Sequence, residues 1–175
     1  MTLKLKRTPG LYLVGFMCSG KTSVGRALAD ELGWCFVDID AEIEAEQGQP
    51  IREIFKTRGE SEFREIETAT LYRHVNKVEA GDPCVIALGG GTFVQSNNWE
   101  MIENNGVTVW LDCTLETVLQ RLGDDIARPL AADRNGLAQL YGDRRPLYAR
   151  ADFHLEVDTD DISAIVQKIL HLPIF

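Results

Sequence analysis

The segment from Leu11 to Gly25, LYLVGFMCSGKTSVG, constrains the fold more than any other part of the chain. It begins with four apolar residues, Leu11 to Val14, which have the length and composition of a buried strand. The next eight, Gly15 to Thr22, match the pattern G-x-x-x-x-G-K-[ST], and a helix-like segment runs from Thr22 to Leu32. A strand, a glycine-rich turn and a helix in this order predict a P-loop.

A P-loop binds phosphate because its backbone N–H groups and the positive end of its helix face one concavity. Glycines at both ends permit the turn. Lys21 is predicted to reach the β- and γ-phosphates, and the Thr22 hydroxyl to bind Mg²⁺. We therefore predict a nucleoside-triphosphate site; a turn that binds nothing is the alternative. The predicted nucleotide contacts in this segment are Gly15, Cys18, Ser19, Gly20, Lys21, Thr22 and Ser23.

The 175-residue chain has the size and composition of one globular domain, with 45% hydrophobic and 26% charged residues. Its net charge of −9 argues against a general nucleic-acid-binding surface, so an anionic ligand must meet a local group of cations. No apolar run reaches the roughly eighteen residues of a membrane span, and Met1 to Pro9 does not resemble a signal peptide. We expect a cytoplasmic protein with no membrane partner.

The four cysteines form no C-x-x-C pair, so we expect all of them to be reduced, and Cys35, Cys84 and Cys113 to be buried in apolar strands. Cys18 is expected to be the most reactive, because it lies beside Lys21 and just before a helix N-terminus. The alternative is that Cys18 is only a tolerated small residue. The three histidines form no spaced set, and no metal role is expected for them.

Apolar runs alternate with helical periodicities along the rest of the chain. This alternation predicts an α/β fold, in which a five-stranded parallel sheet carries helices on both faces. A helix break is expected at Pro146, and Gly59 is expected to end a short helix. Strands are expected at 11–14, 34–37, 84–88, 107–111 and 153–157, and helices at 22–32, 42–47, 50–56, 60–76, 97–105, 114–122, 137–150 and 162–172.

In such sheets ligands bind beyond the carboxyl ends of the strands. The first three predicted strands end in the P-loop, in Asp38 and Asp40, and in Gly89-Gly90-Gly91. The two aspartates are expected to alternate across a strand end, one facing a metal and the other a second substrate; two acids that open a helix are the alternative. The glycines would let a ligand approach the backbone, although a plain flexible turn has the same composition.

Several arginines could supply the local cations, although a solvated surface arginine is the alternative for each. Glu67, three residues after Arg64 in the same helix, is close enough to fix its guanidinium. The other arginines considered are Arg121, Arg128, Arg144 and Arg145. The polar segment 123–136, which contains Arg128, shows no periodicity and is long enough to be a mobile lid.

Together these motifs resemble those of shikimate kinases. GFMCSGKTSVG, FVDID, GESEFREIE, LGGGT, the RPL of IARPL and RRPLY follow one another in the family's order, between Leu11 and about Val157. The resemblance implies a P-loop fold of the nucleoside monophosphate kinase type, usually monomeric. It also implies transfer of the γ-phosphoryl group of ATP, with Mg²⁺, to the 3-hydroxyl of shikimate, on the pathway to aromatic compounds.

Matching positions imply roles on the nucleotide side. Lys21 would hold the β- and γ-phosphates, while Thr22 would bind Mg²⁺ and Asp38 a water on it. Arg121 would stack on adenine. Arg128, on the lid, would close on the transferring phosphate.

On the substrate side, Asp40 would orient or deprotonate the attacking hydroxyl. Arg64 and Arg144 would bind the shikimate carboxylate, with Glu67 supporting Arg64, and Gly89, Gly90 and Gly91 would pack around the ring. The helical region 39–77 would carry much of this site.

The sequence departs from the family pattern at Cys18, where glycine is usual, and at Asp158 to Asp161, where many relatives carry a basic residue. Arg144 is preferred over Arg145 because the family arginine stands two residues before the proline. Two other functions compete: a gluconate kinase-like enzyme that acts on another small acid, and a nucleotide-binding module without catalysis.

Overall fold

The computed structural model of the chain describes residues 10–123 and 134–174. Five strands form one sheet, in which every neighbouring pair is parallel and the order is β2-β3-β1-β4-β5. This arrangement confirms the predicted α/β fold and its five-stranded parallel sheet. The strands are β1 (Gly10–Val14), β2 (Cys35–Asp38), β3 (Cys84–Ala87), β4 (Val107–Asp112) and β5 (Phe153–Glu156).

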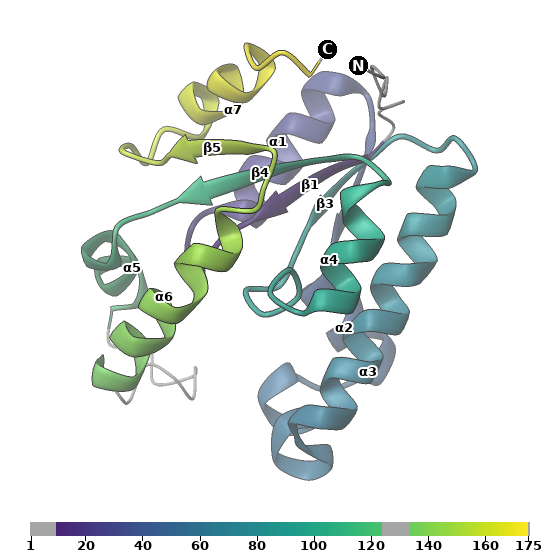
Figure 1. Ribbon diagram of the computed structural model, residues 1–175, viewed down its shortest axis with the longest axis vertical. Helices are drawn as coiled ribbons and strands as arrows, with labels where there is room; N and C mark the ends of the chain where they lie inside the picture. The colour runs from purple at the N-terminus through teal and green to yellow at the C-terminus, as the bar shows by residue number, and fades with distance from the viewer. Residues whose placement is uncertain (1–9, 124–133, 175) are drawn as a thin grey trace.

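Helices cover both faces of the sheet, as Figure 1 shows, with α1 and α7 on one face and α3, α4 and α6 on the other. Within the described ranges, no helix is both long enough and apolar enough to cross a bilayer. The helices are α1 (Lys21–Leu32), α2 (Ile39–Gln47), α3 (Ile51–Glu79), α4 (Ser96–Glu103), α5 (Leu115–Leu122), α6 (Arg134–Tyr148) and α7 (Ile162–Leu170).

The centre of the core is β1, which lies between β3 and β4 and is buried along its whole length. A strand covered on both faces reads as a continuous apolar run, which is why Leu11 to Val14 could be recognised from the sequence. The apolar run Trp34 to Val37 predicts a second buried strand. This prediction of burial is wrong, because β2 lies at the edge of the sheet, where Cys35 is exposed and the other residues are partly buried.

Two expected helix breaks have different outcomes. Gly59, with φ 83°, interrupts the helical geometry inside α3, as predicted. Pro146 does not break α6, which continues to Tyr148, so the predicted break is wrong. Because Pro146 lies in the last turn of α6, its missing N–H removes one hydrogen bond near a helix end.

The cysteines also differ from expectation. Cys35 and Cys84 lie opposite each other on the neighbouring strands β2 and β3, with their Cα atoms 4.6 Å apart, and form a disulfide. The expectation of four reduced cysteines is therefore wrong for this pair, and Cys35 is exposed rather than buried. The two residues are 49 positions apart in sequence, and only the order of the strands brings them together.

Candidate active site

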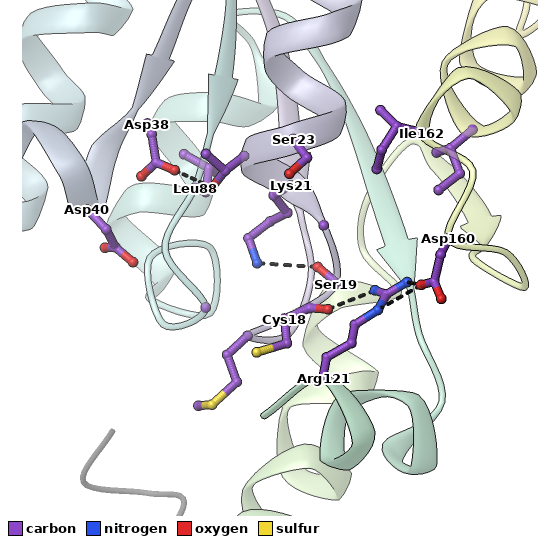
Figure 2. Close-up of a pocket in the computed structure, with 15 residues that line it drawn as sticks. Cys18, Ser19, Lys21, Ser23, Asp38, Asp40, Leu88, Arg121, Asp160 and Ile162 are labelled. Atoms are coloured by element: carbon purple, nitrogen blue, oxygen red, sulfur yellow. Dashed lines mark hydrogen bonds and ion pairs between the residues drawn. The ribbon is translucent and has the colours of Figure 1, made fainter. Parts of the chain in front are cut away.

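The carboxyl ends of β2, β3 and β1 lie at the same edge of the sheet, as predicted, because these neighbouring strands are parallel. Along the chain β2 follows β1, but in the sheet β3 lies between these two strands, and β4 lies on the other side of β1. The strand order therefore reverses at β1, and ligands of such sheets bind in the crevice at this point. A cavity of about 460 Å³ lies there, lined by the P-loop together with Asp38, Asp40, Gly90, Arg121 and Asp160 (Figure 2).

The P-loop has the geometry that its sequence predicts. Gly20, with φ 92°, caps α1, which begins at Lys21. The Lys21 ammonium lies inside the loop and donates to the carbonyl oxygens of Gly15 at 2.9 Å and Phe16 at 2.8 Å. Burial lowers the pKa of Lys21 to about 8, although the nearby carboxylates of Asp40 and Asp38 oppose this shift. Bound phosphate would favour the protonated form.

Cys18 has a backbone conformation that favours glycine, the residue usual at this position in the family pattern. Its φ is 60°, and it is the one residue other than glycine with a positive φ in the described ranges. This left-handed conformation carries no steric cost for glycine but costs roughly 1–2 kcal/mol for residues with a Cβ. Its carbonyl oxygen accepts a hydrogen bond of 2.8 Å from Arg121.

Asp38 joins the P-loop to α2. Its Oδ2 accepts a hydrogen bond of 2.5 Å from the Thr22 hydroxyl, and its Oδ1 accepts one of 3.1 Å from the backbone N–H of Ala41. Magnesium in phosphate sites is typically bound through one or two protein oxygens plus phosphate and water, so this hydroxyl and carboxylate fit the predicted Mg²⁺ site. The described residues contain no group of three His, Cys, Asp or Glu side chains that could hold a metal.

Asp40 lies in the first turn of α2, not on a strand as predicted. The strand ends early because Asp38 caps the helix through the N–H of Ala41, so the helix begins at Ile39. Burial, together with the negative charges of Glu67 and Asp38, raises the pKa of Asp40 to about 6, although the positive charge of Lys21 opposes this shift. A carboxylate with a pKa near neutrality suits proton transfer.

The turn after β3 lies against three side chains of the predicted substrate site. An ideal Cβ on Gly89 would be 2.6 Å from Oδ1 of Asp40, and one on Gly91 would be 2.6 Å from the guanidinium of Arg64. A Cβ on Gly90 would be 3.2 Å from Nη1 of Arg144. The glycines therefore bring one carboxylate and two guanidinium groups around a turn that has no side chains.

Glu67 holds Arg64 as predicted, with 2.8 Å between Arg64 Nη1 and Oε2 of Glu67. The Glu67 side chain is only 1% exposed, and it also accepts hydrogen bonds from Thr92 Oγ1 at 2.5 Å and Gln95 Nε2 at 2.9 Å. Sequence reasoning missed Thr92 and Gln95. The sequence shows a threonine, Thr92, directly after the three glycines, but nothing near it in the chain indicates that it binds Glu67.

Arg144 and Arg145 point to different surroundings. Arg144 lies over the Phe16 ring at 5.8 Å, its positive charge acts on the nearby Tyr148 hydroxyl, and no carboxylate of the described residues pairs with it. Burial raises the pKa of Tyr148 to about 12, so its hydroxyl stays protonated and donates to the Gly90 carbonyl at 2.5 Å. Arg145 is instead paired with Asp112.

Arg121 lies at the opposite end of the cavity from Asp40 (Figure 2). Its guanidinium donates to Asp160 through Nε at 3.2 Å and Nη2 at 2.5 Å. An acidic side chain therefore lies beside Arg121 on the predicted adenine side, within the segment Asp158 to Asp161. Arg128 and residues 124–133 of the predicted lid lie outside the described residues, and residues 134–136 belong to α6.

A P-loop that faces a carboxylate and two guanidinium groups across a glycine turn defines a kinase of small molecules with a P-loop fold. The profile described as shikimate kinase matches residues 17–172. By this match and by the relatives described next, the chain belongs to the shikimate kinase family.

Two relatives and two solved structures illustrate the similarity. A shikimate kinase of Persephonella marina is 41% identical over 161 residues, which cover 91% of this chain and 96% of the relative. One of Parasynechococcus marenigrum is 43% identical over 178 residues, covering 98% and 91%. The structure of shikimate kinase from Acinetobacter baumannii in complex with shikimate superposes with a TM-score of 0.86 at 38% identity, covering 95% of this chain and 93% of that chain. A gluconokinase of Sinorhizobium meliloti shares the fold, with a TM-score of 0.59 at 18% identity and coverage of 94% and 91%.

Proposed function

We propose that the protein transfers the γ-phosphoryl group of ATP to the 3-hydroxyl of shikimate. The observation that carries this proposal is the convergence of Arg64, Arg144 and Asp40 on one glycine turn beside the P-loop. Two guanidinium groups suit a carboxylate, and one carboxylate of raised pKa suits a hydroxyl. Shikimate carries both groups.

On the donor side, the P-loop N–H groups and Lys21 would hold the β- and γ-phosphates. Thr22 would bind Mg²⁺ and Asp38 would hold a water on it, and the metal supplies positive charge to the transferring phosphoryl group when bound. Arg121 would contact adenine, and Asp160 would restrain the direction of its guanidinium. Phosphoryl transfer needs in-line positioning and cancellation of charge, and these residues supply both.

On the acceptor side, the Arg64 and Arg144 guanidinium groups would fix the carboxylate and so direct the ring hydroxyls at Asp40. Asp40 would accept the hydroxyl proton as the oxygen attacks phosphorus. Its pKa of about 6 leaves it ionised at neutral pH while making it a stronger base than an ordinary carboxylate.

Further parts of the proposal rest on family resemblance. Arg128 would close on the phosphate from the part of the predicted lid that precedes α6, which would exclude water and limit hydrolysis of ATP. Residues 39–77 would form the substrate-binding region of a single kinase domain. We further propose a monomeric, cytoplasmic enzyme that binds neither nucleic acid nor membranes.

A coupled assay of ADP release with shikimate and with gluconate tests the proposal. We expect ATP turnover to require shikimate, and the product to carry phosphate on the 3-oxygen. Turnover with gluconate but not with shikimate would instead support the other small-acid kinase. Nucleotide binding without turnover of either acid would support a binding module without catalysis.

A further inference from the structure

Asp112, the last residue of β4, forms an ion pair that the proposed mechanism does not use. Its side chain is 9% exposed, and its two oxygens accept hydrogen bonds from both terminal nitrogens of Arg145, with 2.7 Å between Nη2 and Oδ2. His154 Nε2 lies 2.8 Å from the same Oδ2. A forked arginine–carboxylate contact fixes the guanidinium plane as well as its position.

Aromatic groups restrain Arg145 further. The guanidinium carbon lies 5.0 Å from the centroid of the Trp110 ring and 5.4 Å from that of Tyr141. Nη1 donates to the Tyr141 hydroxyl at 2.7 Å, and that hydroxyl donates to the Cys113 carbonyl at 2.8 Å. Arg145 and Tyr141, one turn apart on α6, are therefore both tied to the end of β4.

The neighbouring residue on α6 faces the proposed substrate site. Successive residues of an α-helix are rotated by about 100°, so fixing Arg145 on β4 also sets the direction of Arg144. Arg144 points toward Phe16, Gly90 and Tyr148. The rotation of α6 about its own axis is thus set on one side by Asp112 and on the other by the glycine turn.

We propose that Asp112 is a positioning residue for the substrate carboxylate, which acts through Arg145 to hold Arg144 at the glycine turn. This inference rests on the proposed function, because it assigns Arg144 to the acceptor. Asp112 touches neither substrate nor nucleotide in this account. Its loss should therefore weaken shikimate binding, leave MgATP binding nearly unchanged, and have no further effect once Arg144 is absent.

Two variants test the inference by different routes. Asp112→Asn keeps the shape of the side chain but removes the charge, and Arg145→Met keeps the apolar stem but removes the donors. His154→Gln is the matched control, because His154 contacts the same carboxylate from β5, and its side chain is 48% exposed. For each variant, the KM values for shikimate and MgATP and the Kd of shikimate by calorimetry would be measured, with Asp112→Asn also made in an Arg144→Ala background.

We expect Asp112→Asn and Arg145→Met each to raise the KM and Kd for shikimate about three- to tenfold, with the KM for MgATP within twofold of the unchanged protein. Asp112→Glu, which keeps the charge, should recover part of the loss, and His154→Gln should change the shikimate KM less than twofold. In the Arg144→Ala background, Asp112→Asn should add less than twofold.

Equal losses for both substrates, or an unchanged effect of Asp112→Asn after removal of Arg144, would overturn the inference in favour of a merely structural ion pair. If Asp112→Asn does not melt cooperatively, Arg145→Met decides the matter, because its partly exposed site tolerates substitution better. If the wild-type protein does not phosphorylate shikimate, the proposed function itself is overturned. If the wild-type protein is active and Asp112→Asn has the same KM and Kd for shikimate, only this inference is overturned.

Discussion

Gly89 approaches Asp40 so closely that an ideal Cβ on the glycine would lie 2.6 Å from Oδ1 of the aspartate. Real Cβ atoms do not come this close to another heavy atom, so a side chain at Gly89 would displace the carboxylate. The same Cβ would also lie 2.9 Å from Thr92 Oγ1 and 3.1 Å from Glu67 Oε1. Because these two side chains also crowd the Cβ, moving the Asp40 carboxylate alone would not make room for it.

Gly89→Ala should therefore lower kcat by about a hundredfold, as expected when a reacting group is displaced by about 1 Å. Steady-state kinetics with ATP and shikimate would measure the loss. Gly142→Ala is the control: it lies within α6, nothing approaches its Cβ position within 4 Å, and it should keep normal turnover. A Gly89→Ala enzyme with more than a third of normal kcat would show that this contact does not set the position of Asp40.

Asp40→Asn should lower turnover at least about a hundredfold, as for loss of a general base, while nucleotide binding stays near normal. In the unchanged protein, kcat/KM for shikimate should rise with pH through about 6, the raised pKa of Asp40, because only the ionised carboxylate accepts the proton. A pH–rate profile from 5 to 8 would measure this. A variant that keeps more than a tenth of the activity would exclude Asp40 as the base.

The same raised pKa carries a consequence for stability. A carboxyl whose pKa is higher in the folded than in the unfolded state favours folding while it is protonated, and this contribution is lost as pH rises from about 4 through about 6. At pH 8, Asp40→Asn should therefore be more stable than the unchanged protein, by up to about 3 kcal/mol. Thermal melts should show the gap close below about pH 4; a less stable variant at pH 8 would contradict the assignment.

Arg144→Ala and Arg64→Ala should each weaken shikimate binding roughly tenfold to 150-fold, since a charge-assisted hydrogen bond contributes about 1.5–3 kcal/mol. Arg145→Ala should cause a smaller loss, because Arg145 is engaged by Asp112. Calorimetric titration with shikimate would rank the three variants. A loss at Arg145 larger than that at Arg144 would mean that the two arginines have been assigned the wrong way round.

A small alkylating reagent should label Cys18 before the other cysteines. Cys18 is partly exposed in the P-loop, Cys113 is buried, and Cys35 and Cys84 are joined. Labelling should abolish kinase activity and should be slowed by MgADP, which mass mapping at successive times would follow. Cys18→Gly should remain active, resist the reagent and relieve the left-handed strain at φ 60°. Labelling of Cys113 first, or no protection by nucleotide, would refute the reactive assignment.

The disulfide predicts a simple thiol count. In denaturant without reductant, two thiols per chain should react with a chromogenic disulfide, and after reduction four should react. Cys35→Ser should lower the free energy of unfolding of the oxidised protein by about 2–4 kcal/mol, because the covalent link no longer restricts the unfolded chain. In excess reductant the variant and the unchanged protein should melt close together. Four reactive thiols from the start would mean that this pair is not joined in the purified protein.

The features that the sequence predicted well depend on residues close together in the chain. The P-loop lies within eight residues, and Glu67 follows Arg64 by one helical turn, so periodicity and spacing indicate both. The choice of Arg144 over Arg145 came from the family pattern, and the structure directs Arg144 to the glycine turn.

The features that the sequence did not predict depend on strand order or on competition at element ends. Cys35 pairs with Cys84 only because β2 and β3 are neighbours in the sheet, and Asp112 pairs with Arg145 only because α6 packs against the end of β4. The apolar pattern predicts a strand end at Asp40, because it does not reveal that the Asp38 carboxylate caps a helix that begins at the next residue.

Because β3 lies between β2 and β1, the turn after β3 runs between the element that carries Asp40 and the P-loop. Because this turn consists of three glycines packed against functional side chains, few substitutions in it would be tolerated. A larger residue there would not reshape the acceptor pocket but would collide with the groups that define it. A redesign toward another hydroxy acid would therefore have to vary α3 and α6, the two helices that carry the arginines, and keep the three glycines unchanged.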